Sequence, residues 1–359
     1  MTTTKDADTG AQDEQREQTR LALGAMLIPL FFVTMFALCI IGTYHKPHPN
    51  GIKVGVVGPP ALTAPLRAAI EKQAGSAFDV STVATVAQGA HDVRQRDLNA
   101  AFVPTASPKQ PATVIVASAG GRLTATAAET LARAVTATQG QQLVVRDVRT
   151  LPSGDEIGIG IFMFMVVCTI CGYLAVTLLF TVAPALHPRR RYLIIVAVSI
   201  LVPTIAYLIG GLGFGTYTAS FGTILAFIAV GALYTLVIGL VTRLLQVLIG
   251  PPALFVSLAI FVFLNIPSLG ATYTVTMLPS FWRFLNGFWI GAETTNAERS
   301  LLYFDWQGVG ADVLRLLAWT AVIVALLLLP VSRKLARQRE HEVAANTFGA
   351  AIPHLARHS

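Results

Sequence analysis

Charged side chains are scarce in this sequence of 359 residues. Asp, Glu, Lys and Arg together make up 13% of the chain, whereas apolar residues make up 54%. A soluble domain carries about 25% charged residues, so the composition predicts a membrane protein with some soluble mass attached. The net charge of +7 does not indicate a nucleic-acid partner, because the basic residues cluster in short runs beside apolar segments.

Cysteines and nucleotide-binding motifs are scarce as well. Of three Cys, Cys168 and Cys171 form one CxxC in an apolar run, and without a second ligand pair this favours packing residues over a metal site. The glycines and prolines of Gly55–Pro60 lack the GxxxxGK[ST] pattern of a phosphate loop. No Ser/His/Asp arrangement has a diagnostic spacing. We therefore expect no cofactor, no metal and no enzymatic activity.

Six apolar segments are candidates for membrane spans, because a spanning helix needs about 20 apolar residues. They are Leu21–Thr43, Ile157–Leu186, Tyr192–Gly213, Phe221–Ile249, Pro252–Leu269 and Val313–Val331. The fifth is the shortest. Asp and Glu are absent from the central part of every span, which counts against a self-powered secondary transporter, because such carriers usually need a polar or acidic site at mid-depth.

Basic clusters indicate the orientation through the positive-inside rule. Arg16 and Arg20 precede the first span, Arg189, Arg190 and Arg191 join the second to the third, and Arg333 and Lys334 follow the sixth. With an even number of spans, these clusters fall on one side together with both termini. We predict a multi-pass protein of the plasma membrane with both termini in the cytoplasm.

The stretch between the first two spans, residues 44–156, has ordinary polarity. We expect strands or short apolar runs at Ile52–Val57, Phe78–Val83, Ala100–Val103, Thr113–Ala117 and Leu143–Val148, and helices at Leu62–Gln73, Ala90–Asp97 and Leu123–Thr138. Strands that alternate with helices predict a small α/β domain. Its position after the first span places it outside the cytoplasm.

The predicted fold is an α-helical polytopic membrane protein with six transmembrane helices and a small α/β extracytoplasmic domain between helices 1 and 2. We expect a cytoplasmic N-terminal segment at 1–20, the first transmembrane helix at 21–43, the α/β domain at 44–156, a five-helix transmembrane domain at 157–331 and a cytoplasmic tail at 332–359. The acidic leader before the first span does not fit a signal peptide, so we interpret this span as a permanent anchor.

The segment 278–304, between the fifth and sixth spans, is too polar to cross a bilayer and too apolar for an ordinary loop. Aromatic residues recur at helical spacing in its first half, Gly291 interrupts it, and a second helix can follow. One interpretation is a re-entrant hairpin covered by protein. Another is an amphipathic helix on the membrane surface.

A third and weaker interpretation of this segment is an enzymatic site. Glu293, Asn296, Glu298, Arg299 and Asp305 are expected on its outward-facing side. Two glutamates beside an arginine are more often a solvated or ion-paired helix face than a catalytic centre.

The layout resembles the permeases of the ABC-2 type. It is more closely similar to their phage-infection-protein-like branch and to membrane proteins related to a yeast nitrosoguanidine-resistance protein. The similar strings are Leu278–Trp282, Gly291–Ala292 and Asn296–Phe304 before the last span, and Asp97–Pro104 in the α/β domain. The resemblance concerns structural motifs and extends from Leu21 to about Arg339.

The resemblance implies export of an apolar or amphipathic compound, such as a drug, a lipid or a lipid-linked polymer. It implies a homodimer in membrane lipid, with a separate ABC ATPase and no nucleic-acid partner. The outer gate would be the hairpin 278–304, with Phe281, Trp282, Gly291, Asn296, Arg299 and Tyr303. The ATPase would dock at Arg189, Arg190 and Arg191. The alternative is a non-transporting scaffold or receptor whose α/β domain binds an envelope partner.

Overall fold

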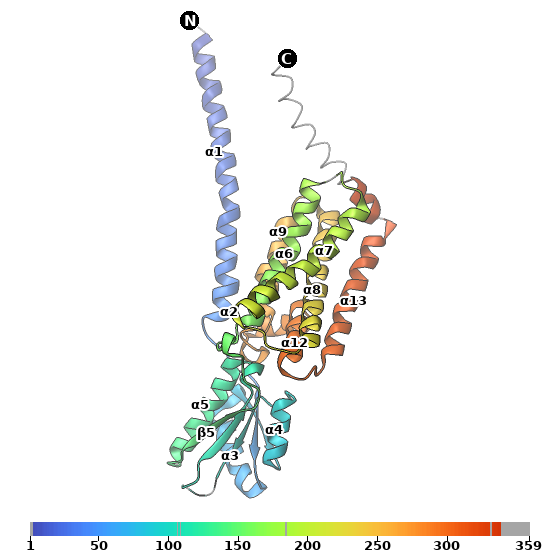
Figure 1. Cartoon of the computed structure of the whole chain (residues 1–359). Coiled ribbons are helices and arrows are strands. Elements are labelled where there is room, and N and C mark those ends of the chain that lie inside the picture. Colours follow the sequence, from blue (N-terminus) through green and yellow to red (C-terminus); the bar gives the residue numbers. More distant parts are fainter. Residues whose placement is uncertain (1–2, 106, 108, 184, 331, 339–359) are drawn as a thin grey trace. The chain divides into compact units, whose positions relative to one another are not determined.

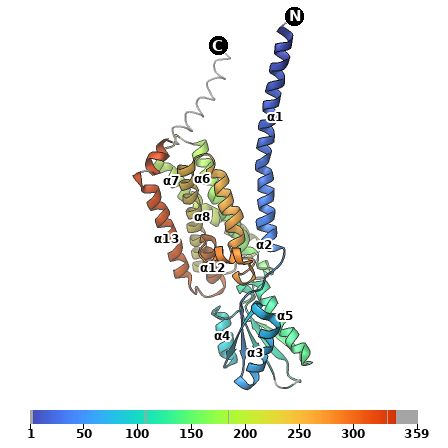
Figure 2. The same ribbon diagram turned by 180° about the vertical axis from the view of Figure 1, so that it is seen from behind.

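The computed structural model of the chain describes residues 3–105, 107, 109–183, 185–330 and 332–338. It contains two compact units, Met1–Lys46 and Pro47–Ser359, drawn in Figures 1 and 2. In the first unit, α1 (Thr3–Phe36) continues into a π-helical turn (Ala37–Ile41) and α2 (Gly42–Tyr44). Its part Gln15–Tyr44 is long and apolar enough to cross a membrane.

The second unit begins with a five-stranded sheet (Figure 1). Its strands are β1 (Ile52–Val57), β2 (Phe78–Val83), β3 (Ala100–Val103), β4 (Ala112–Val116) and β5 (Leu143–Asp147). The order is β2-β1-β3-β4-β5. β1 is parallel to β2 and β3, β4 is antiparallel to β3, and β5 is parallel to β4. The strands predicted at Ile52–Val57 and Phe78–Val83 are confirmed with these bounds.

Helices cover both faces of the sheet, which explains why β1 is a nearly continuous apolar run. The helices are α3 (Pro60–Ala74), α4 (Val86–Arg94) and α5 (Arg122–Thr138). α3 and α5 pack on one face, where Ile70 and Ala128 meet Ile52 and Phe102 in a single core. α4 packs on the other face through Val93.

The helix predicted at Ala90–Asp97 corresponds to α4, and its predicted start is wrong by four residues. Thr85 caps this helix, because its side-chain oxygen accepts a hydrogen bond from the Gln88 amide at 3.2 Å, and the helix therefore begins at Val86 and not at Ala90. It ends at Arg94, and Arg96 then adopts a left-handed backbone with φ of 64°. The predicted end at Asp97 is wrong for this reason.

The remaining helices of the second unit form what we call the bundle. Its long members are α6 (Gly160–Val182), α7 (Pro188–Tyr207), α8 (Phe221–Ile249) and α13 (Val309–Leu328), with the shorter α9 (Ala253–Leu258), α10 (Ile266–Ser268), α11 (Ser280–Asn286) and α12 (Ile290–Tyr303). α8 contacts α6, α7, α12 and α13. Small residues allow close helix packing; a Cβ on Gly172 of α6 would lie 3.2 Å from Ile238 of α8.

Five helices in the described part of the chain are long and apolar enough to cross a membrane, which indicates a membrane-embedded protein. They are Gln15–Tyr44, Gly160–Val182, Pro188–Gly213, Phe221–Ile249 and Val309–Leu328. The segment predicted as a fifth span is the shorter apolar helix Ala253–Ser268, which includes a π-helical stretch at Ala259–Asn265. The count of six spans and the side on which the α/β domain lies stay predictions.

The segment between α10 and α13 completes both faces of the sheet. Met277 belongs to the core under α3 and α5, and Phe304 belongs to the core under α4. Backbone bonds from His48 to Met277 and from Asn50 to Thr276 add to the first contact, and an ion pair between Arg149 and Asp305 adds to the second. The two cores of the α/β domain are therefore completed by Met277, directly before the hairpin 278–304, and by Phe304 at its end.

Gly121 offers a test of the packing between the α/β domain and the segment that follows α10. Its φ is 150°, and a Cβ on it would overlap the side chain of Thr274, whereas Gly140 has a φ of 63° and no atom within 4 Å of such a Cβ. Gly140→Ala carries only backbone strain of roughly 1–2 kcal/mol, and Gly121→Ala adds overpacking of about 1–3 kcal/mol. We expect Gly121→Ala to lower the apparent melting temperature of the detergent-purified protein clearly more than Gly140→Ala. Equal effects would contradict the close packing of Thr274 on the start of α5.

Candidate functional site

α12 combines a polar sequence with almost complete burial. Its sequence, IGAETTNAERSLLY, contains two Glu, one Arg and one Asn, and 11 of its 14 residues are buried. It lies against α6, α8 and α13, which are strongly apolar. Burial of polar groups is costly unless each one is paired, and ionisable residues inside a membrane bundle commonly serve function. α12 is therefore the centre of the candidate site.

Gly291 allows α12 to approach the segment that precedes it. A Cβ at this position would overlap Oδ1 of Asn265 and the side chain of Leu269. Asn265 is fully buried at the end of the π-helical stretch. Because any larger residue would push the two segments apart, Gly291 fixes the position of α12 in the bundle.

Glu298 is the most unusual residue of α12. Its exposed fraction is 0%, and in the described part of the chain neither carboxyl oxygen has a hydrogen-bond partner. It lies close enough to Cys168 and Tyr217 to interact with both electrostatically. Burial raises the pKa of Glu298 well above its ordinary value, because the charged form loses its hydration. The side chain is thus a proton-binding group inside the bundle.

A short string of polar side chains continues from α12 into the bundle. The Tyr234 hydroxyl lies 2.7 Å from the Thr169 hydroxyl and accepts a hydrogen bond of 2.7 Å from the Asn265 amide. Among the described residues, Asn265 Oδ1 and the Thr295 hydroxyl have no partner. Buried polar atoms without partners are rare and are typical of sites for water, an ion or a proton.

Glu293 is held in a different way, by an ion pair between α12 and α13. Its Oε2 accepts a hydrogen bond of 2.5 Å from Nη1 of Arg315, which also lies 3.6 Å from Asp312. The expectation of an outward-facing polar surface is therefore wrong for both Glu293 and Glu298, because the exposed fractions are 5% and 0%. Asp305 is exposed and pairs with Arg149.

The two halves of the hairpin 278–304 have different environments. Phe281 is 54% exposed and Phe284 is 69% exposed on α11, which is suitable for contact with lipid or headgroups. Trp282 is buried. A surface-lying helix therefore describes only the first half, because α12 is enclosed by protein.

The residues predicted for the gate on α12 have different neighbours. Asn296 accepts a hydrogen bond of 3.3 Å from Arg96. Arg299 is 5% exposed and donates to the carbonyls of Gly270 and Ala271. Tyr303 is half-buried beside the core under α4. Together with Gly291, these residues lie on one helix, whereas Phe281 lies apart from them on the exposed face of α11.

The three arginines predicted to dock an ATPase are not equivalent. Arg189 and Arg190 are exposed at the start of α7. Arg191 is 3% exposed, donates to the Leu186 carbonyl at 2.6 Å, and lies over the ring of Phe180. Its burial corrects the expectation that all three side chains are accessible to a partner.

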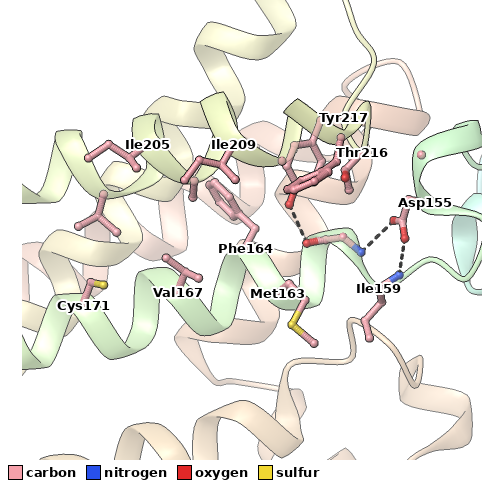
Figure 3. Close-up of a pocket in the computed structure, with 16 residues that line it drawn as sticks. Asp155, Ile159, Met163, Phe164, Val167, Cys171, Ile205, Ile209, Thr216 and Tyr217 are labelled. Carbon is pink, nitrogen blue, oxygen red and sulfur yellow. Dashed lines mark hydrogen bonds between the residues drawn. The ribbon is translucent and has the colours of Figure 1, made fainter. Parts of the chain in front are cut away.

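An apolar cavity of about 420 Å³ lies between the start of α6 and the end of α7 (Figure 3). Asp155 lies at one end of the cavity. Its two carboxyl oxygens accept hydrogen bonds from the amides of Ile159 and Gly160 at 2.8 and 2.9 Å. The Tyr217 hydroxyl donates to the Gly160 carbonyl at 2.8 Å. Most of the remaining wall consists of aliphatic and aromatic side chains, so the cavity suits an acyl chain.

No group of three or more metal-ligating side chains occurs among the described residues. Cys168 is buried and Cys171 is partly buried, and neither forms a disulfide. Comparison with models of protein families, with curated proteins and with solved structures finds no match for this chain.

Sequence reasoning missed three residues of this region. Asn265 interrupts the apolar run Phe261–Leu269, and this interruption was a usable signal. Tyr234 in α8 and Arg96 in the α/β domain carried no such signal, because their partners are far away in the sequence.

The pH dependence of stability tests the burial of Glu298. A carboxyl with a raised folded-state pKa loses stability as pH rises above its unfolded value of about 4.3, by about 1.4 kcal/mol per pKa unit. Glu298→Gln removes this loss, so we expect its apparent melting temperature to exceed that of the parent at pH 7. The difference should shrink towards zero at pH 4.5. The control is Glu156→Gln, at an exposed position, and a pH-independent difference for Glu298→Gln would exclude the assignment.

Proposed function

We propose that this chain is a permease-like subunit that exports an apolar or amphipathic compound across the plasma membrane. The observation that carries the proposal is the burial of the polar helix α12 among α6, α8 and α13. A membrane anchor has no need to enclose Glu298 and Asn265 without full hydrogen bonding, and such groups commonly mark transport pathways. The resemblance to ABC-2 type permeases adds independent support.

The energy source in this proposal is a separate cytoplasmic ATPase. The sequence contains no Walker motif, and the exposed Arg189 and Arg190 offer a basic docking point at the start of α7. Permeases of the similar family work as dimers, so we extend the proposal to a homodimer. The hairpin 278–304 then acts as the gate on the side of the α/β domain.

A second candidate function is proton-linked transport, and Glu298 favours it. The absence of acidic residues from the central parts of the spans counted against a self-powered carrier. In the structure, however, α12 places the buried carboxyl of Glu298 next to the long apolar helices. Proton relays in transporters use such buried carboxyls. The two energy sources differ in whether an ATPase is needed.

The hairpin can be tested with two glycine variants. A Cβ at Gly291 would overlap Asn265, whereas a Cβ at the exposed Gly287 would lie 3.4 Å from its nearest neighbour, a carbonyl oxygen. We expect Gly291→Ala to lose most of the efflux of fluorescent amphipathic dyes from cells that overproduce the protein, and Gly287→Ala to retain it. Efflux is compared at equal amounts of membrane-inserted protein. Normal efflux in Gly291→Ala would favour the scaffold or receptor alternative.

The ATPase can be tested by extraction from the native membrane in mild detergent, followed by mass spectrometry. We expect a stoichiometric ATPase that is lost in the double variant Arg189→Glu, Arg190→Glu, because charge reversal removes the basic docking point. The control reverses Lys72 and Lys109, which are exposed in the α/β domain. Dye efflux without any co-purified ATPase, and dependent on Glu298, would favour proton-linked transport instead.

A further inference from the structure

A second cavity, of about 230 Å³, lies where the α/β domain meets the hairpin. Its walls come from the start of β1, the end of α4 with the loop that leads to β3, the residue after β4, the first turn of α5, and the segment 269–304. Three cationic side chains line it, Lys53, Arg96 and Arg299, and no Asp or Glu is among the lining residues. The ionisable side chains that line this cavity are therefore all cationic.

Arg96 is fixed in position on the wall of the cavity. Its backbone has a φ of 64°, a conformation that is uncommon for residues other than glycine. Its guanidinium donates to Ser300 at 2.8 Å and to Asn296 at 3.3 Å, and it lies 5.4 Å from the ring centre of Phe304. These contacts hold the cation against α12 with neutral partners only.

Arg299 is the second cation of the cavity wall, and it is buried. It is 5% exposed, and its Nη2 atom donates to the carbonyls of Gly270 and Ala271 at 2.9 and 2.7 Å. Burial lowers the pKa of Arg299 to about 9, and repulsion from Arg96 contributes, so the group keeps its charge at neutral pH. The guanidinium groups of Arg96 and Arg299, which both line the cavity, therefore repel one another.

No acidic side chain in the described residues forms an ion pair with either arginine. Asp312 attracts Arg96 electrostatically, but its carboxyl is already paired with Arg315 at 3.6 Å. Arg299 is buried and Arg96 is partly buried, and two like charges in such positions without an ion-paired acid are expensive. The arrangement lowers its free energy if an anion enters the cavity.

Other groups around the cavity also favour an anion. Gly121 and Thr124, at the start of α5, line the cavity. No side chain caps this helix, so the positive end of the helix dipole is available to an anion. The Asn99 side chain is fixed by the Lys53 amide at 2.9 Å. Lys53 itself is exposed and adds a third positive charge at the rim.

We propose that this cavity binds a phosphate group, either of a free phosphate compound or of a lipid headgroup. Guanidinium groups bind phosphate oxygens through paired, charge-assisted hydrogen bonds. The volume is smaller than the 300–1,000 Å³ typical of sites for drug-sized ligands, so the ligand presents its phosphate here and leaves larger parts outside. Binding at this site does not depend on transport, so the failure of the proposed function would leave it untouched.

The experiment uses the purified full-length protein in an uncharged detergent. Its apparent melting temperature is measured with inorganic phosphate against chloride at equal ionic strength, and with phosphatidylglycerol against phosphatidylcholine in mixed micelles. We expect phosphate to stabilise the protein relative to chloride, or phosphatidylglycerol to stabilise it relative to phosphatidylcholine, or both. Stabilisation by inorganic phosphate identifies a free phosphate ligand, and stabilisation by phosphatidylglycerol alone identifies a headgroup.

Three variants separate binding from folding. Arg96→Gln removes a partly buried charge, Lys53→Gln removes an exposed one, and Arg133→Gln on the outer surface of α5 is the matched control. We expect the apparent affinity for the stabilising anion to fall roughly tenfold or more in Arg96→Gln and several-fold in Lys53→Gln, with no change in Arg133→Gln. The proposal is overturned if neither anion stabilises the protein, or if all three variants respond as the parent does.

Discussion

The structure of the second unit depends on the packing of one segment against both faces of the sheet. Met277 fills the core under α3 and α5, Phe304 fills the core under α4, and the chain between them forms the hairpin. A sheet side chain that loses such a neighbour loses dispersion contacts and leaves a cavity. The α/β domain and α12 therefore cannot shift independently without opening one of these cores. Any movement of the hairpin is expected to involve the domain as well, which makes the domain a structural part of the site.

The polar atoms of α12 would be costly in an inert helix. Neither oxygen of Glu298 has a partner in the described residues, and Arg299 is paired only with neutral carbonyls. The unpaired acid lies towards α6, and the arginine lies towards the cavity below the α/β domain. One helix thus separates a proton-binding group from an anion-binding group. This separation allows the two sides of α12 to have different ligands.

Local patterns predicted the elements of the fold better than they predicted the site. The apolar runs of β1 and β2 and the long apolar helices depend on neighbours in the sequence, so their positions were largely predictable. Glu298 was expected on an exposed face because two glutamates beside an arginine are more often a solvated or ion-paired helix face. Its burial results from contacts with α6 and α8, which no local pattern encodes. Arg96 was missed for the same reason, because its partners Asn296 and Ser300 are about 200 residues away. Asn265 could have been found, since a single amide within an apolar run already indicates a buried polar contact.

The discontinuous core of the α/β domain has a consequence for how this protein can change in evolution. Residues 47–156 contain every strand of the sheet, yet two side chains that complete its cores come from a segment that follows α6, α7 and α8 in the sequence. The domain is therefore not a module that can be exchanged alone. A homologous domain could replace it only together with a matching segment 273–304, and so the domain and the hairpin are expected to diverge as a pair.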